Sequence, residues 1–111
     1  MSFNAIRYIL IMIRSFKCRD TQALFQGLAV ARFANFRSVA ERKLAMLHRA
    51  HRLSDLRVPP SNRLESLQGD RKGRYSIRIN EQWRICFRFD RADVFEVEIV
   101  DYPERKRRGD T

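Results

Sequence analysis

The middle of the chain contains two runs in which apolar and polar residues alternate, over 74–79 and 83–89. Alternation of this kind predicts β-strands, because successive side chains of a strand point to opposite faces. Residues 80–82 have a length suited to a hairpin loop. The predicted hairpin has one apolar face, which another element must cover, formed by Tyr75, Ile77, Ile79, Trp83, Ile85, Phe87 and Phe89.

The opposite face of the hairpin carries Arg74, Arg78, Arg84 and Arg88. Such a face is either an ordinary solvated side of an antiparallel sheet or a phosphate-binding platform, because guanidinium groups are planar, permanently charged donors. No acidic residue interrupts it between the first and the last arginine, and this single sign favours phosphate binding. Strict alternation also places Cys86 on this face, where we expect it to be partly exposed.

Helices are predicted before the hairpin. A short helix capped by Asp20 or Thr21 ends near Gly27. The main helix begins either at the capping box of residues 38–41 or earlier, near Phe36. Its apolar side consists of Val39, Ala40, Leu44, Leu47 and Ala50, and its charged positions, Arg42, Lys43, Arg49 and Arg52, are expected to face solvent.

Strands are predicted at both ends of the chain, with residues 31–35 as a weakly patterned connector. An apolar run over 10–16 predicts a buried strand. After a turn over 90–93, a last strand carries Phe95, Val97 and Ile99 on one face and ends at Asp101 and Tyr102. A helix that covers one face of a small sheet defines an α+β domain.

Composition and charge limit the function. At 111 residues, with 44% hydrophobic and 32% charged residues, the chain is one globular domain. A net charge of +10 suggests a polyanionic partner: nucleic acid, an anionic membrane or an acidic protein. Cys18 and Cys86 are interpreted as reduced thiols of a cytoplasmic protein. The apolar run over 10–16 is too short to span a bilayer.

Known catalytic motifs are absent, and His48 and His51 suggest no third metal ligand, so we expect no metal site. RNA can still be cleaved when its own 2′-hydroxyl attacks the adjacent phosphate. Arg84 and Arg78 suit the neutralisation of the transition state. Tyr102 can stack on a base or donate a proton, and Asp101 or Glu65 can orient the 2′-hydroxyl.

Several segments resemble HigB-type toxins of the RelE superfamily: RVPPSNRLESLQGDRKG at 57–73, SIRINEQWRICF at 76–87 and VEIVDY at 97–102, together with MIRSF at 12–16 and SVAERKLAML at 38–47. The resemblance therefore covers most of the chain. It implies a fold similar to small microbial ribonucleases, with two N-terminal helices on a small, mainly antiparallel twisted sheet.

The resemblance also implies an activity and partners. Such proteins are toxins of type II toxin–antitoxin modules, which enter the A site of the 70S ribosome and cleave translated mRNA without a cofactor. A HigA-type helix-turn-helix antitoxin neutralises them, and they meet operator DNA only through that antitoxin. Membrane binding is not expected. The alternative is a catalytically degenerate homologue that acts only as an antitoxin- or RNA-binding module.

The family pattern transfers unevenly to this chain. Arg84 matches the sheet arginine that contacts the scissile phosphate, and Arg63 matches a basic residue. Asp101 and Tyr102 match the start of a C-terminal Asp-Tyr-His, so a proline, Pro103, replaces the histidine. Where some members have a histidine and a lysine, this chain has Glu65 and Gln68.

We therefore assign two sets of residues. The catalytic set is Arg84, Tyr102, Asp101 and Glu65, and the RNA-binding set is Arg63, Gln68, Arg71, Lys72, Arg74, Arg78 and Arg88. We expect a single toxin domain over 12–102, preceded by an extension over 1–11 with an alternative start at Met12, and followed by a basic tail over 103–111. Because Arg84 lies on the non-core face, Arg84→Ala is expected to abolish toxicity and leave folding intact.

Overall fold

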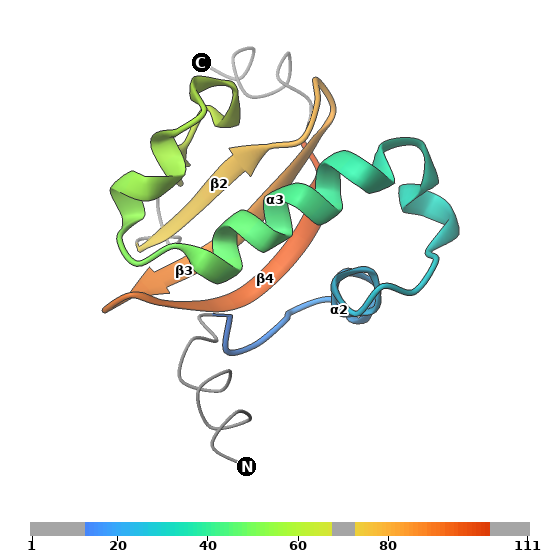
Figure 1. The fold of residues 1–111 in the computed structure, drawn as a ribbon, viewed down its shortest axis with the longest axis horizontal. Coiled ribbons are helices and arrows are strands. Elements are labelled where there is room, and N and C mark those ends of the chain that lie inside the picture. Colours follow the sequence, from blue (N-terminus) through green and yellow to red (C-terminus); the bar gives the residue numbers. More distant parts are fainter. Residues whose placement is uncertain (1–12, 68–72, 103–111) are drawn as a thin grey trace.

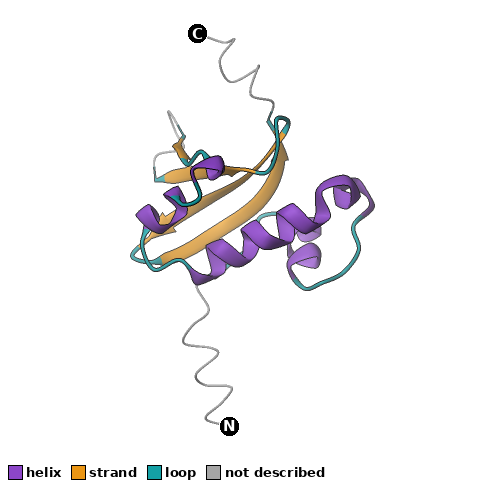
Figure 2. Cartoon of the chain, turned by 45° about the horizontal axis from the view of Figure 1, so that its top comes forward, coloured by secondary structure: helices purple, strands orange, loops and turns teal. Residues whose placement is uncertain are grey.

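The computed structural model describes residues 13–67 and 73–102. Four strands form an antiparallel sheet in the order β1 (Glu65–Ser66), β2 (Arg74–Arg78), β3 (Trp83–Asp90) and β4 (Asp93–Asp101). Helix α3 (Arg37–Arg49) crosses one face of this sheet, and α2 (Arg19–Phe25) lies beside it (Figure 1). The two helices lie on the same side of the sheet (Figure 2), which confirms the expected α+β class.

The central hairpin follows the predicted alternation. Ile77 pairs with Ile85 and Tyr75 with Phe87 across β2 and β3, and both isoleucines and Phe87 are fully buried. In the loop, the side-chain oxygen Oδ1 of Asn80 accepts hydrogen bonds from the backbone N–H groups of residues 82 and 83, both at 2.8 Å. A local side-chain cap of this kind fixes the turn and therefore the register.

Strand β4 departs from the predicted alternation. Its register against β3 shifts between Cys86 and Arg88, and Glu96 has a φ of +56°, as in a β-bulge. Val94, Val97 and Ile99 consequently face the core, and Phe95 faces the other side, where the guanidinium of Arg88 lies 4.4 Å from its ring centroid. The expectation that Phe95 shares a face with Val97 and Ile99 is wrong, because the bulge adds one residue between them.

The connector before α3 is a 3-10 helix, η1 (Ala31–Phe36), that buries two phenylalanines. The ring centroids of Phe33 and Phe36 lie 6.0 and 5.1 Å from that of Trp83. Helix α3 begins directly after Phe36, as one of the two predicted starts has it. The capping box over 38–41 is not formed, since the helix has no side-chain cap; Arg37 pairs instead with Glu41 at 3.1 Å.

One charged position of α3 is buried. Lys43, expected in solvent, is only 5% exposed, and its Nζ donates a 2.6 Å hydrogen bond to Oδ1 of Asn62. The segment that follows the helix covers it. This segment contains two 3-10 helices, η2 (Leu53–Arg57) and η3 (Pro60–Asn62), and leads into β1. Helical periodicity alone does not reveal such a cover, because the segment returns to α3 through tertiary packing.

The N-terminal stretch lies along the free edge of β4. Ile13 and Phe16 form parallel bridges to Val94 and Val97. The predicted strand over 10–16 is therefore represented by two isolated bridges, and residues 10–12 lie outside the described part of the chain. The short helix is confirmed as α2, but the expected cap is wrong: the helix begins at Arg19 with Cys18 as its N-cap residue, and no side chain caps it. Thr21 lies inside the helix and accepts a 3.0 Å hydrogen bond from the backbone N–H of Ile99.

Candidate functional site

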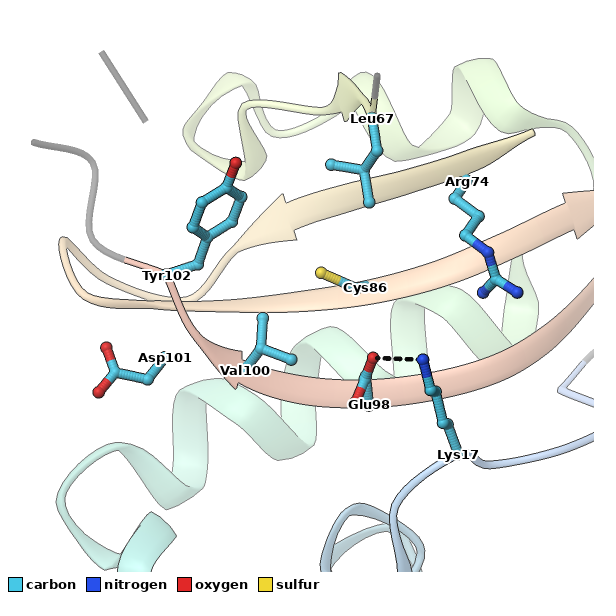
Figure 3. A pocket seen from close by; sticks show the side chains of 8 residues that line it. All are labelled: Lys17, Leu67, Arg74, Cys86, Glu98, Val100, Asp101 and Tyr102. Carbon is cyan, nitrogen blue, oxygen red and sulfur yellow. Dashed lines mark ion pairs between the residues drawn. The ribbon is translucent and has the colours of Figure 1, made fainter. Parts of the chain in front are cut away.

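A cavity of about 290 Å³ opens on the face of the sheet that α3 leaves uncovered (Figure 3). Its size is near the lower end of the range for small-ligand sites. Its walls come from β2, β3, the end of β4, the residue that follows β1 and the stretch before α2: Lys17, Leu67, Arg74, Cys86, Glu98, Val100, Asp101 and Tyr102. Three residues of the assigned sets, Arg74, Asp101 and Tyr102, therefore meet at one cavity, although Arg74 is distant in sequence from the other two.

Arg84 lies beside this cavity but below the surface, with 0% of its side chain exposed. Its strand neighbour Cys86 and its cross-strand partner Val100 both line the cavity. Its Nε donates to Oγ of Ser76 at 2.7 Å, and its Nη2 donates to the carbonyl oxygen of Ser76 at 3.1 Å. The arginine face is therefore not simply solvated, because the guanidinium of Arg84 is buried and hydrogen-bonded within the protein.

The segment around β1 completes the surroundings of Arg84. The carbonyl oxygen of Arg63 accepts a 2.5 Å hydrogen bond from Nη2 of Arg84, and a carboxylate oxygen of Glu65 lies 4.0 Å from the same nitrogen. Glu65 is the cross-strand partner of Ser76, which binds Arg84, and this pairing brings the carboxylate of Glu65 close to Arg84. Two residues that were assigned from the sequence, Arg63 and Glu65, are thus placed next to Arg84.

The end of β4 presents Tyr102 and Asp101 differently. The backbone N–H of Tyr102 donates to the carbonyl oxygen of Gln82 at 2.7 Å, and its ring stands at the cavity beside Leu67 in Figure 3. The carboxylate of Asp101 points away from that ring in the same view, and its Oδ2 accepts a 3.1 Å hydrogen bond from Nε2 of Gln82. Tyr102 is therefore the better placed of the two for contact with a ligand in the cavity.

The remaining arginines spread along the sheet. Arg74 lines the cavity and pairs with Glu96, and this guanidinium lowers the pKa of that carboxyl. Arg78 is the cross-strand partner of Arg84, at the end of β2 next to the hairpin loop. Arg88 is not among the cavity-lining residues and lies 3.9 Å from Asp90. The assigned residues Gln68, Arg71 and Lys72 lie outside the described residues.

Sequence reasoning missed Lys17 and Glu98, whose side chains form a 3.6 Å ion pair on the cavity wall. Lys17 reaches the site because residues 13–17 run beside β4, a long-range contact for which the sequence carries no local signal. Glu98 is recoverable from alternation, since Val100 and Tyr102 follow it on the same face. Cys86, expected to be partly exposed, is only 8% exposed because the cavity walls surround it.

The two histidines lie away from the cavity. The ring of His48 packs 5.1 Å from that of Phe25, and burial lowers the pKa of His48. His51 is exposed. Within residues 13–67 and 73–102, no group of three or more potential ligands is arranged to hold a metal ion. Cys18 and Cys86 are both free thiols.

A family comparison assigns this architecture. Residues 22–102 match the family described as RelE-like toxin of type II toxin-antitoxin system HigB. The match covers most of the chain and includes the second half of α2, all of α3 and the whole sheet, so the protein belongs to the HigB-like toxin family. No helix of the described part is both long and apolar enough to cross a lipid bilayer.

Two of the three relatives described next carry HigB names. Toxin HigB-1 of Vibrio cholerae is 52% identical over 48 residues, which are 43% of this chain and 50% of the relative. An uncharacterized protein of Haemophilus influenzae is 38% identical over 61 residues, 55% of this chain and 60% of the relative. Endoribonuclease HigB of Proteus vulgaris is 30% identical over 92 residues, 82% of this chain and 99% of the relative. The chain thus spans about half the length of the first relative.

Proposed function

We propose that this protein is the toxin of a type II toxin–antitoxin module and acts as a ribosome-dependent endoribonuclease that cleaves translated mRNA and arrests growth. Membership of the HigB-like family supports the toxin assignment, and the name of the Proteus vulgaris relative supports the activity. The net charge of +10 suits a polyanionic substrate. A HigA-type antitoxin is the proposed inhibitor, and the cytoplasm, where mRNA is translated, is the proposed compartment.

The observation that carries the proposal is the immobilised guanidinium of Arg84 next to a cavity that Tyr102 and Arg74 line. A cation that is withheld from solvent acts at short range with little screening, and because it is already fixed, it costs no reorganisation during the reaction. Arg84 thus favours the negative charge that develops on a phosphate at the cavity.

The proposed reaction is a transesterification. The 2′-oxygen attacks the adjacent phosphorus, the bond from phosphorus to the 5′-oxygen breaks, and a 2′,3′-cyclic phosphate and a 5′-hydroxyl result. The proton of the 2′-hydroxyl passes to a base, for which Glu65 and Asp101 are the candidates, and the leaving oxygen gains a proton. Tyr102 stacks on a base or supplies that proton. Partly exposed cations beside the cavity hold the backbone of the RNA: Arg63, Arg74 and Arg78.

Induced expression tests the proposal. Primer extension on a message and on the same message without its start codon should reveal new cuts in the translated copy only, together with growth arrest. Tyr102→Ala should lower cleavage by about 10- to 100-fold, because the loss of one stacked base costs about 1–3 kcal/mol. Arg49→Ala, at an exposed position of α3, is the control and should cleave as wild type does. If both messages stay intact and growth continues, the enzymatic proposal is wrong.

The complete burial of Arg84 favours a second candidate, a degenerate toxin that binds antitoxin or RNA without cleavage. This candidate predicts salt-sensitive RNA binding with no cleavage products. A binding titration at two salt concentrations, followed by analysis of the recovered RNA on a gel, separates the two candidates.

A further inference from the structure

The buried ammonium of Lys43 lies in an unusual setting. Its residue is 5% exposed, yet no acidic side chain lies within 4 Å of Nζ among residues 13–67 and 73–102. Its hydrogen-bond partner is the amide oxygen of Asn62, at 2.6 Å. A buried cation without a counter-ion is costly, and an apolar residue here would pack against the core at lower cost. Core packing alone therefore does not account for lysine at this position.

Asn62 transmits this contact to the chain that precedes β1. It is fully buried, and its Nδ2 donates to the carbonyl oxygen of Leu56 at 3.0 Å. Since Lys43 holds the oxygen of the same amide, Asn62 is fixed at both ends. The end of η3 is thereby anchored to α3.

Arg63 connects the anchored Asn62 to Arg84, beside the cavity. It follows Asn62 directly and has a φ of +45°, the left-handed region that non-glycine residues rarely adopt. In this conformation its carbonyl oxygen accepts the 2.5 Å hydrogen bond from Nη2 of Arg84. Ser76 holds the same guanidinium from the other side. A shift of Asn62 would displace the carbonyl of Arg63 and rotate Arg84.

We propose that Lys43 and Asn62 are positioning residues, which set the orientation of the Arg84 guanidinium through the carbonyl of Arg63. The inference rests on the proposed ribonuclease function, in which Arg84 stabilises the developing charge. Burial first, and then the charges of Arg42, Arg78 and Arg84, lower the pKa of Lys43.

The test compares three variants in multiple-turnover cleavage of ribosome-bound mRNA. Lys43→Met keeps the length and volume of the side chain but removes its donor. It should lower kcat by about 10-fold or more, because small misplacements of a reacting group cost up to about 100-fold, and it should leave KM within about twofold. Lys43→Arg keeps a cationic donor and should restore most of kcat. Leu44→Ala, a buried neighbour outside the chain of contacts, controls for lost stability and should keep kcat when folded.

A second measurement does not depend on cleavage. In the full-length protein, hydrogen exchange of the Nε–H of Arg84 is compared with that of the backbone amide of Ile85. Lys43→Met should speed the first by about 10-fold relative to the second, and Leu44→Ala should speed both together. A kcat within twofold of wild type together with an unchanged exchange ratio would overturn the inference. If wild type fails to cleave, the proposed function fails, and the exchange ratio still decides whether Lys43 orients Arg84.

Discussion

The two faces of the sheet are buried by different means. The face toward α3 buries aliphatic and aromatic side chains, among them Ile77, Ile85 and Phe87. The opposite face buries Ser76 and Arg84 with equal completeness, and hydrogen bonds from Nε and Nη2 of Arg84 to Ser76 and to the carbonyl of Arg63 hold these polar groups. Apolar burial needs only volume that fits, whereas a buried guanidinium needs fixed acceptors at fixed distances. The second face therefore restricts the positions of its residues more tightly than the apolar face does. The cavity lies on this second face.

The largest expected effect breaks the apolar face. Phe87→Ala should lower the free energy of unfolding by about 4 kcal/mol, because it removes a fully buried ring and leaves a cavity. Urea denaturation measures this loss. A loss below about 1 kcal/mol would mean that the core of the sheet is able to collapse around the missing ring.

The next effect breaks the polar face. Arg84→Ala should cost about 3 kcal/mol, because the buried Ser76 Oγ and the Arg63 carbonyl lose their donor. The expectation from the sequence that this variant folds as wild type does is therefore replaced by a prediction of lost stability. Arg88→Ala, on the same face but with a side chain 35% exposed, should cost less than about 1 kcal/mol in the same denaturation experiment.

A smaller change in stability is expected at Phe95, which the bulge in β4 places on the face opposite to Val97. Phe95→Ala should cost about 1 kcal/mol, since its ring is only partly buried and contacts Arg88. Val97→Ala, at a fully buried position two residues later, removes fewer atoms and should nevertheless cost more. If thermal unfolding gives the reverse order, Phe95 lies in the core and the bulge is misplaced.

The smallest effect concerns pH and the α3 side of the sheet. Burial lowers the pKa of His48, and its Nδ1 is buried with no hydrogen-bond partner within the described residues, so the folded state disfavours the protonated ring. The unfolded state then binds more protons as the pH falls, and stability should drop as the pH falls through and below the ordinary histidine pKa of about 6.5. Denaturation midpoints should fall less in His48→Gln. The exposed His51→Gln should retain the wild-type dependence.

Local patterns predicted much of this architecture. Alternation over 74–79 and 83–89 gave the hairpin, its loop and its two faces, because a strand side chain has only two directions. Periodicity gave the long helix and its buried Ala40, Leu44 and Leu47. The errors have two causes: Phe33, Lys43 and Cys86 owe their burial to segments that are distant in the chain, whereas Phe95 changes face because of the bulge within β4.

The candidate site divides in the same way. The sequence shows the residue types and the strand faces that carry them, and these predict Arg84, Tyr102 and Arg74 as site residues. The sequence does not predict their different surroundings, because the alternation along a strand does not show which guanidinium is buried and which lines a cavity. Lys17 entered the site only through the bridges of residues 13–17 to β4.

The sequence by itself determined the class of fold, the direction of the side chains on β2 and β3 and the excess of positive charge, since these follow from local geometry and composition. The tertiary structure alone decided that Arg84 is enclosed by Ser76 and the carbonyl of Arg63, and that Lys43 reaches Asn62. The physical reason is that burial and hydrogen bonding join residues far apart in the chain, and no local pattern encodes the distance between them.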